Sequence, residues 1–146
     1  MLFRSVHTID RPKLVHALDR GAERGGRRLR VLVQVALDRA APAPAADRPE
    51  LHRGGAAGEQ TLELADLVAQ SGWLELGGVM AVAPLDEDPD MAFARLAQVA
   101  AAVRERYAGA CWISAGMSGD LEAAVRHGAT HLRVGTAILG SRPPLR

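Results

Sequence analysis

Two short stretches near the end of the chain carry residue types that bind phosphate. Residues 114–120 (SAGMSGD) and 133–137 (RVGTA) each read as a strand that ends in a turn of small residues and opens a helix. Such a turn presents backbone N–H groups and the positive end of a helix dipole to an anion. Two such turns at the ends of neighbouring strands predict a site for one phosphate group. Each turn taken alone is equally consistent with an ordinary turn that binds no ligand.

The side chains of the two stretches support this interpretation. Gly116 and Gly135 lack a Cβ, so the backbone there can approach a ligand or adopt a positive φ. Ser118 is expected as the N-cap of the next helix, and Thr136 offers both an amide and a hydroxyl. Arg133 lies two residues before Gly135 and therefore on the same side of the strand, which puts a guanidinium beside the anion.

Strands and helices alternate along the whole chain. Periodicity and breaker residues predict strands over 2–9, 29–37, 74–83, 111–115 and 130–134, and helices over 10–22, 61–69, 89–107, 119–127 and 138–140. Asp10 is expected as the N-cap of the first helix, with Pro12 in its first turn. Arg4 and His7 are expected on the outward side of the first strand. This order indicates βα units and a parallel sheet.

The motifs together resemble the YggS/PROSC family of pyridoxal 5′-phosphate (PLP) homeostasis proteins. The matching segments are SVHTID (5–10), LVQV (32–35), GVMAVAP (78–84), SAGMSGD (114–120) and RVGTAILG (133–140). The family is built on a barrel similar to the N-terminal domain of alanine racemase. The resemblance implies an α/β fold that is a partial (β/α)8 TIM barrel of about five parallel strands, the family's strands 4 to 8. It implies one incomplete PLP-binding domain over 1–146, from which the first three strands and the PLP lysine are missing.

The resemblance also implies a cofactor site. The residues it places at PLP are Met80, Gly116, Met117, Ser118, Arg133, Gly135 and Thr136. The phosphate would be held by Ser118, Gly135 and Thr136, and Arg133 would face the pyridine nitrogen. A guanidinium cannot accept a proton, so the cofactor would be a poor electron sink. Two plainer alternatives stay open, namely Met80 as core filler and Arg133 as the partner of a neighbouring carboxylate.

Lys13 is the only lysine of the chain. A lysine that binds PLP covalently must lie in a desolvated interior, where burial disfavours its charged form. Lys13 falls in the first turn of an outer helix and is expected in water, while the only tyrosine, Tyr107, falls at a helix end away from the site. We expect no catalytic residue and weak, non-covalent PLP binding in a protein of PLP homeostasis. A PLP-dependent racemase or decarboxylase is disfavoured.

The composition of the chain excludes several kinds of partner. The chain has 146 residues, 48% of them hydrophobic, with a net charge of +1 and 3% aromatic residues, which argues against a nucleic-acid partner. No apolar run approaches the roughly 20 residues that span a bilayer, so no membrane partner is expected. One cysteine, Cys111, expected as a small core residue, excludes an internal disulfide and fits a cytoplasmic protein. No metal site is expected.

Two further expectations concern the loop over 38–58 and the edges of the sheet. The loop is rich in Ala, Pro, Arg and Gly and is expected to be mobile; Arg53 is the nearest match to the lysine of the family's Lys-x-Gly element there. An open five-stranded sheet has two unpaired edges, which favour association. Two alternatives to a PLP-binding protein remain open. The chain is an inactive fragment, or it is half of a split barrel that is completed by an N-terminal partner half or by self-association.

Overall fold

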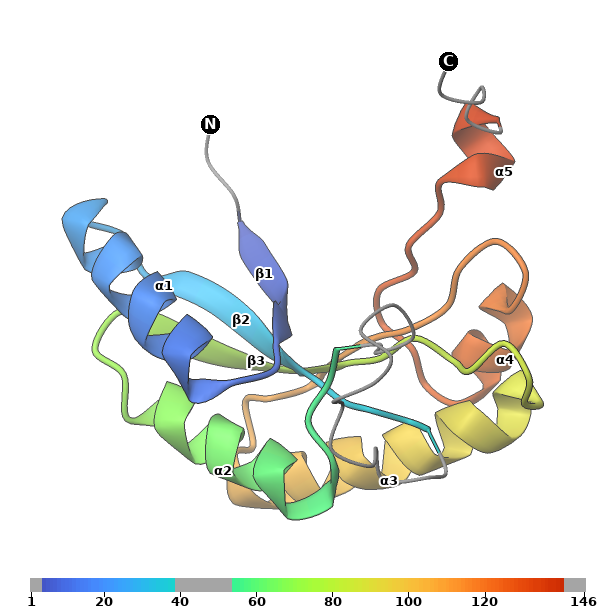
Figure 1. Cartoon of the computed structure of the whole chain (residues 1–146), viewed down its shortest axis with the longest axis horizontal. Coiled ribbons are helices and arrows are strands. Elements are labelled where there is room, and N and C mark those ends of the chain that lie inside the picture. Colours follow the sequence, from blue (N-terminus) through green and yellow to red (C-terminus); the bar gives the residue numbers. More distant parts are fainter. Residues whose placement is uncertain (1–3, 39–53, 141–146) are drawn as a thin grey trace, which may run out of the picture.

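The computed structural model describes residues 4–38 and 54–140, with Thr136 and Ala137 described by their backbone alone. The elements in chain order are β1 (Ser5–Ile9), α1 (Pro12–Arg24), β2 (Leu29–Gln34), α2 (Gly58–Ala69), β3 (Leu74–Met80), α3 (Pro89–Arg106), β4 (Trp112–Ser114), α4 (Leu121–Arg126) and α5 (Thr136–Leu139). Helices α1, α2 and α3 cover one face of the sheet, and α5 stands apart at the end of an extended segment (Figure 1). Most of the loop expected over 38–58 lies outside the described residues.

The sheet is parallel, in the order β1-β2-β3-β4. The βα alternation expected from the sequence is confirmed, because each of these strands and each of the helices α1 to α4 overlaps its predicted range. No helix in the described part of the chain is long and apolar enough to cross a membrane.

The fifth predicted strand, over 130–134, is wrong. This segment pairs with β4 as a strand would only at an isolated bridge between Ser114 and His131. The Thr130 hydroxyl accepts a hydrogen bond from the Ile113 amide at 2.9 Å, so a side chain occupies the donor that a fifth strand would use. The described residues therefore contain four strands of the expected barrel.

The hydrophobic core lies between the sheet and its helices. Val31 and Val33 of β2 and Val79 of β3 are fully buried on this side. They belong to one cluster with fully buried helix side chains, Val15, Leu64, Val68, Phe93 and Leu96. Because side chains alternate along a strand, the residues between these valines point to the other side, which we call the inner face.

Two smaller expectations are also wrong. Helix α1 has Arg11 at its N-cap instead of Asp10, since the Arg11 carbonyl accepts the first helical bonds, from the Leu14 and Val15 amides. The Asp10 carboxylate caps no helix amide and pairs with the Arg11 guanidinium at 2.8 Å. Cys111 is exposed and not part of the core, and its thiol donates to the Ala108 carbonyl at 3.1 Å. Pro12 does begin α1, as expected.

Candidate functional site

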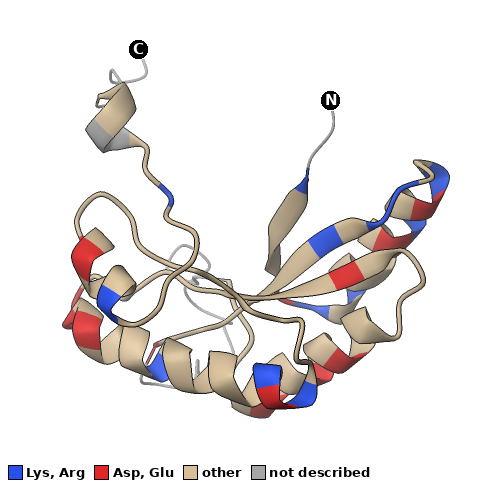
Figure 2. Ribbon diagram, turned by 180° about the vertical axis from the view of Figure 1, so that it is seen from behind, with Lys and Arg blue, Asp and Glu red and all other residues tan. Residues whose placement is uncertain are grey.

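Polar and aromatic side chains occupy much of the inner face. Charged residues lie mostly on the helices and few lie on the strands (Figure 2). The inner face and the segment after α4 carry Ser5, His7, Arg30, Gln34, Glu75, Met80, Trp112, Ser114, His131 and Arg133. Arg30 pairs with Glu75 and lies 4.5 Å above the Trp112 ring. The His131 ring is tilted against the Trp112 ring, with the two ring centroids 4.2 Å apart.

Arg133 reaches the carboxyl ends of two strands. Its Nη1 donates to the carbonyl and the hydroxyl of Ser114, at 2.8 and 3.0 Å, and its Nη2 donates to the Ala81 carbonyl at 2.8 Å. Burial lowers the pKa of the Arg133 guanidinium, and the charge of Asp120 opposes this effect. Among the described residues, the hydrogen-bond partners of the Arg133 guanidinium are neutral oxygens and not a carboxylate.

Met80 lies beside Arg133 at the same end of the sheet. It is the last residue of β3, pairs in register with Gln34 and Ser114, and is 5% exposed. Met80 lies outside the hydrophobic cluster on the helix side. Met80 and the guanidinium of Arg133, which binds the neighbouring Ala81 carbonyl, thus both lie where the strands end, as a heteroaromatic ring with a polar edge would require.

The turn over 114–120 differs from its expected form. Ser118 is not the N-cap of α4: Asp120 occupies that position, and its carboxylate accepts from the Met117 amide at 2.6 Å. The Asp120 amide donates back to the Met117 carbonyl at 3.0 Å, so residues 117–120 form a turn and α4 begins at Leu121. Gly116 does adopt a positive φ, +91°, and a Cβ there would lie 2.7 Å from the Ala124 side chain. Its missing side chain therefore makes room for α4.

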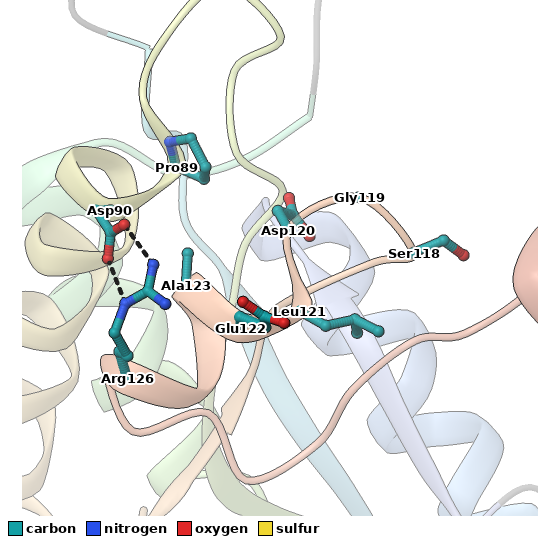
Figure 3. Close-up of a pocket in the computed structure, with 9 residues that line it drawn as sticks. All are labelled: Pro89, Asp90, Ser118, Gly119, Asp120, Leu121, Glu122, Ala123 and Arg126. Carbon is teal, nitrogen blue, oxygen red and sulfur yellow. Dashed lines mark hydrogen bonds and ion pairs between the residues drawn. The ribbon is translucent and has the colours of Figure 1, made fainter.

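The two halves of the expected phosphate site do not share either of two cavities that the described residues line. Ser118 lines an open cavity of about 440 Å³ together with Asp90, Asp120, Glu122 and Arg126, among others, but the described lining does not include Arg133 or Gly135. Arg126 pairs with Asp90 at 2.6 Å, and Ser118 points away from that pair (Figure 3). The carboxylates of this cavity are unsuited to a phosphate.

Gly135 precedes α5, and its carbonyl accepts the amides of Ile138 and Leu139 at 3.0 and 2.8 Å. The expected turn at Gly135 and Thr136 therefore exists and opens a helix. A Cβ on Gly135 would meet no atom within 4 Å, so the space beside this turn is open.

Sequence reasoning missed two groups near this end of the sheet. His7 lies on the inner face, partly buried, and not on the outward side. Gln34 donates to the Gly54 carbonyl and lines a cavity of about 240 Å³ with Asp38 and Val82. The signal for Gln34 was its place directly after the apolar run Val31-Leu32-Val33.

The chain belongs to the alanine racemase N-terminal domain family, whose sequence profile matches residues 3–143. Within this class it resembles the PLP homeostasis proteins, as its motifs indicate. It is 44% identical to the "pyridoxal phosphate homeostasis protein" of Mycobacterium tuberculosis H37Rv over 147 residues, and 38% identical to that of Corynebacterium glutamicum over 146. These alignments cover 94% and 95% of this chain but only 53% and 62% of the relatives.

A solved structure agrees with this assignment. PipY of Synechococcus elongatus PCC7942, with PLP bound, matches with a TM-score of 0.77 and 27% sequence identity, over 94% of this chain and 61% of PipY. The chain therefore spans somewhat more than half the length of these relatives.

Proposed function

We propose that this chain is a cytoplasmic PLP-binding protein of cofactor homeostasis, and that it binds PLP at the carboxyl end of its sheet. The observation that carries the proposal is the meeting of Arg133, Met80 and Ser114 where β3 and β4 end. Membership of a family in which PipY has been solved with PLP bound supports the choice of ligand.

Each residue has a separate role in this proposal. Arg133 faces the pyridine nitrogen, and since a guanidinium cannot accept a proton, that nitrogen stays largely unprotonated. Met80 provides apolar contact for the ring. Bound PLP supplies an aldehyde and a conjugated ring that can withdraw electrons.

The phosphate end follows the family resemblance. Gly135 and Thr136 offer backbone amides and a hydroxyl at the start of α5, and Ser118 adds a second hydroxyl from the turn that contains Gly116 and Met117. Ser118 is exposed, so it remains accessible to a ligand. The acidic cavity beside it is not part of the proposed site.

Binding is proposed to be weak and non-covalent, and the protein is proposed not to be an enzyme. Lys13 is exposed on α1, which covers the face of the sheet opposite the inner face. Tyr107, the only tyrosine, donates to the Asp66 carboxylate at 2.6 Å, and this bond raises the pKa of its hydroxyl. Neither side chain supplies the Schiff base or the proton acceptor that a racemase needs.

A PLP titration of the purified chain tests the proposal. Binding is measured by absorbance and by equilibrium dialysis, and the titration is repeated after borohydride reduction. We expect binding without a reducible adduct. The double variant Ser118→Ala/Thr136→Val should weaken binding more than Arg133→Ala, because charge-assisted bonds to a phosphate exceed one contact to a ring nitrogen. Arg24→Ala, exposed at the end of α1, is the control. Equal affinities for all variants would show that the site lies elsewhere, and an adduct at Lys13 would refute the non-covalent mode.

A second candidate function is favoured by the uncovered inner face of the sheet. No helix covers this face (Figure 1) among the described residues, and β1 is an edge strand. The chain would then be half of a barrel whose first three strands, with the PLP lysine, come from an N-terminal partner half. Restored PLP binding on mixing with such a half would support this candidate.

A further inference from the structure

A continuous chain of hydrogen bonds crosses the inner face and ends on Arg133. The Ser5 hydroxyl lies 2.9 Å from His7 Nε2, and His7 Nδ1 lies 3.0 Å from the Ser114 hydroxyl. Arg133 Nη1 donates to that same hydroxyl at 3.0 Å. The chain joins β1 to β4 although two strands lie between them, which the curvature of the sheet allows.

The chemistry of these groups determines the direction of the bonds. A guanidinium only donates, so the Ser114 oxygen accepts from Arg133 and must pass its own hydrogen to an acceptor. Ser114 is fully buried, and His7 Nδ1 is the partner within reach. The His7 proton then resides on Nε2 and is donated to Ser5. One tautomer thus satisfies every group in the chain.

The surroundings of His7 favour its neutral form. Burial is the largest cause that lowers the pKa of His7, followed by the charges of His131 and Arg133. The His131 ring packs edge-on against the His7 ring, with centroids 5.9 Å apart. Arg30 and Glu75, the charged residues of β2 and β3 on this face, pair with each other. The neighbours of His7 along the hydrogen-bonded chain are the neutral Ser5 and Ser114.

We propose that His7 is a positioning residue for Arg133. As a neutral imidazole it accepts the Ser114 hydroxyl hydrogen, so that the Ser114 oxygen turns toward Arg133 and holds the guanidinium over the ends of β3 and β4. Protonated His7 cannot accept this bond and places a second positive charge near Arg133. The link to PLP rests on the proposed function. The hydrogen-bonded chain from Ser5 through His7 and Ser114 to Arg133, which we call the relay, is a property of the unliganded protein.

Nuclear magnetic resonance of the ¹⁵N-labelled, unliganded protein tests the relay itself. We expect the His7 ring to carry its proton on Nε2 and to titrate below about 6.5, the ordinary value for histidine. In Arg133→Ala the midpoint should move upward, because a neighbouring positive charge has been removed, and Arg24→Ala should leave it unchanged. A proton on Nδ1 in the wild type, or an unchanged midpoint in Arg133→Ala, would overturn the proposal.

PLP affinity as a function of pH tests what the relay does. Asn keeps a polar atom near the position of Nδ1 and Gln keeps one near Nε2, so His7→Asn can preserve the bond to Ser114 and His7→Gln cannot. We expect His7→Gln to weaken PLP binding by up to about tenfold, the upper value for the loss of one hydrogen bond between neutral groups. His7→Asn should retain most of the affinity. His16→Gln, exposed on α1, is the control.

The pH profile separates positioning from a merely structural role. Wild-type affinity should fall more steeply than that of His7→Asn as the pH falls below about 6.5 and through the lowered pKa of His7, because only the wild type gains a charge beside Arg133. Titration of PLP itself is common to both proteins and cancels in the comparison. Parallel profiles would overturn the proposal. If PLP binds at no pH while the resonance results are as expected, the proposed function fails and the relay stands.

Discussion

A side chain on Gly78 would collide with the backbone of the neighbouring strand. Gly78 has φ = +144°, and a Cβ there would lie 2.0 Å from the Trp112 carbonyl oxygen, its register partner on β4. A shift in the pairing of β2 with β3 falls at the same place, between Val31 and Leu32. Glycine is required here by both conformation and space.

Gly78→Ala should therefore lower the free energy of unfolding by at least about 3 kcal/mol, since strain and overpacking add. Urea denaturation followed by circular dichroism measures the change. Gly109→Ala is the control, because a Cβ on Gly109 would meet nothing within 4 Å. Its effect should stay within about 0.5 kcal/mol. Similar denaturation midpoints for the two variants would contradict the close approach of β3 to β4.

His7 also makes stability depend on pH. Its pKa is lowered in the folded protein, chiefly by burial. Below about pH 6.5 the unfolded chain gains a proton that the folded chain does not take up, so stability falls as the pH falls from there through the folded pKa. The urea midpoint of the wild type should drop over this window more than that of His7→Asn. Identical pH dependence in the two proteins would show that His7 titrates normally.

At the scale of elements, helix α3 begins with a cap that links it to the loop after β3. The Asp88 side chain accepts from the Asp90 amide at 3.0 Å, and Pro89 occupies the first turn. Asp90 pairs with Arg126 and His127 at the end of α4, and the bond from Arg126 is the main cause that lowers its pKa. The start of α3 thus fixes α4, which follows the turn proposed to contact phosphate.

Asp88→Ala should cost about 1 kcal/mol of stability, the usual value of an N-cap. Asp86→Ala, exposed two residues earlier, removes the same charge without removing a cap and serves as the control. Chemical denaturation of the two variants gives the comparison. Equal losses would mean that charge alone, and not the cap, stabilises the start of α3.

At the scale of the whole molecule, apolar side chains are exposed at the end of the described chain. Ile138 and Leu139 of α5 are 74% and 84% exposed, and this helix stands away from the sheet (Figure 1). Within residues 4–38 and 54–140 no helix covers the inner face, and β1 is an edge strand. These are the features that promote association of folded chains.

We therefore expect the purified chain to associate, and sedimentation velocity at several concentrations measures this. Ile138→Glu/Leu139→Glu should shift the distribution toward monomer. Leu85→Glu, at a site that is 91% exposed in the β3 to α3 loop, should not. A sharp monomeric peak for the wild type, with cooperative melting, would refute the expectation.

Much of the fold follows from local patterns. Apolar periodicity, Pro12 and the β-branched runs predict β1 to β4 and α1 to α4 close to their observed ranges, because these signals act within a few residues. The residue types of the candidate site, Met80, Arg133, Gly135 and Thr136, were also visible in the sequence. Family membership rests on the same local motifs.

Contacts between distant residues decided the rest. The Thr130 hydroxyl occupies the Ile113 amide and ends the sheet at four strands among the described residues. The irregular pairing of β1 with β2 between Val6 and Ile9 interrupts the alternation of sides, so strand periodicity could not place His7 on the inner face. The sequence by itself determined which groups are present and which elements carry them. Only the tertiary structure decided which atoms meet, because every bond that holds the Arg133 guanidinium comes from residues 19 or more positions away.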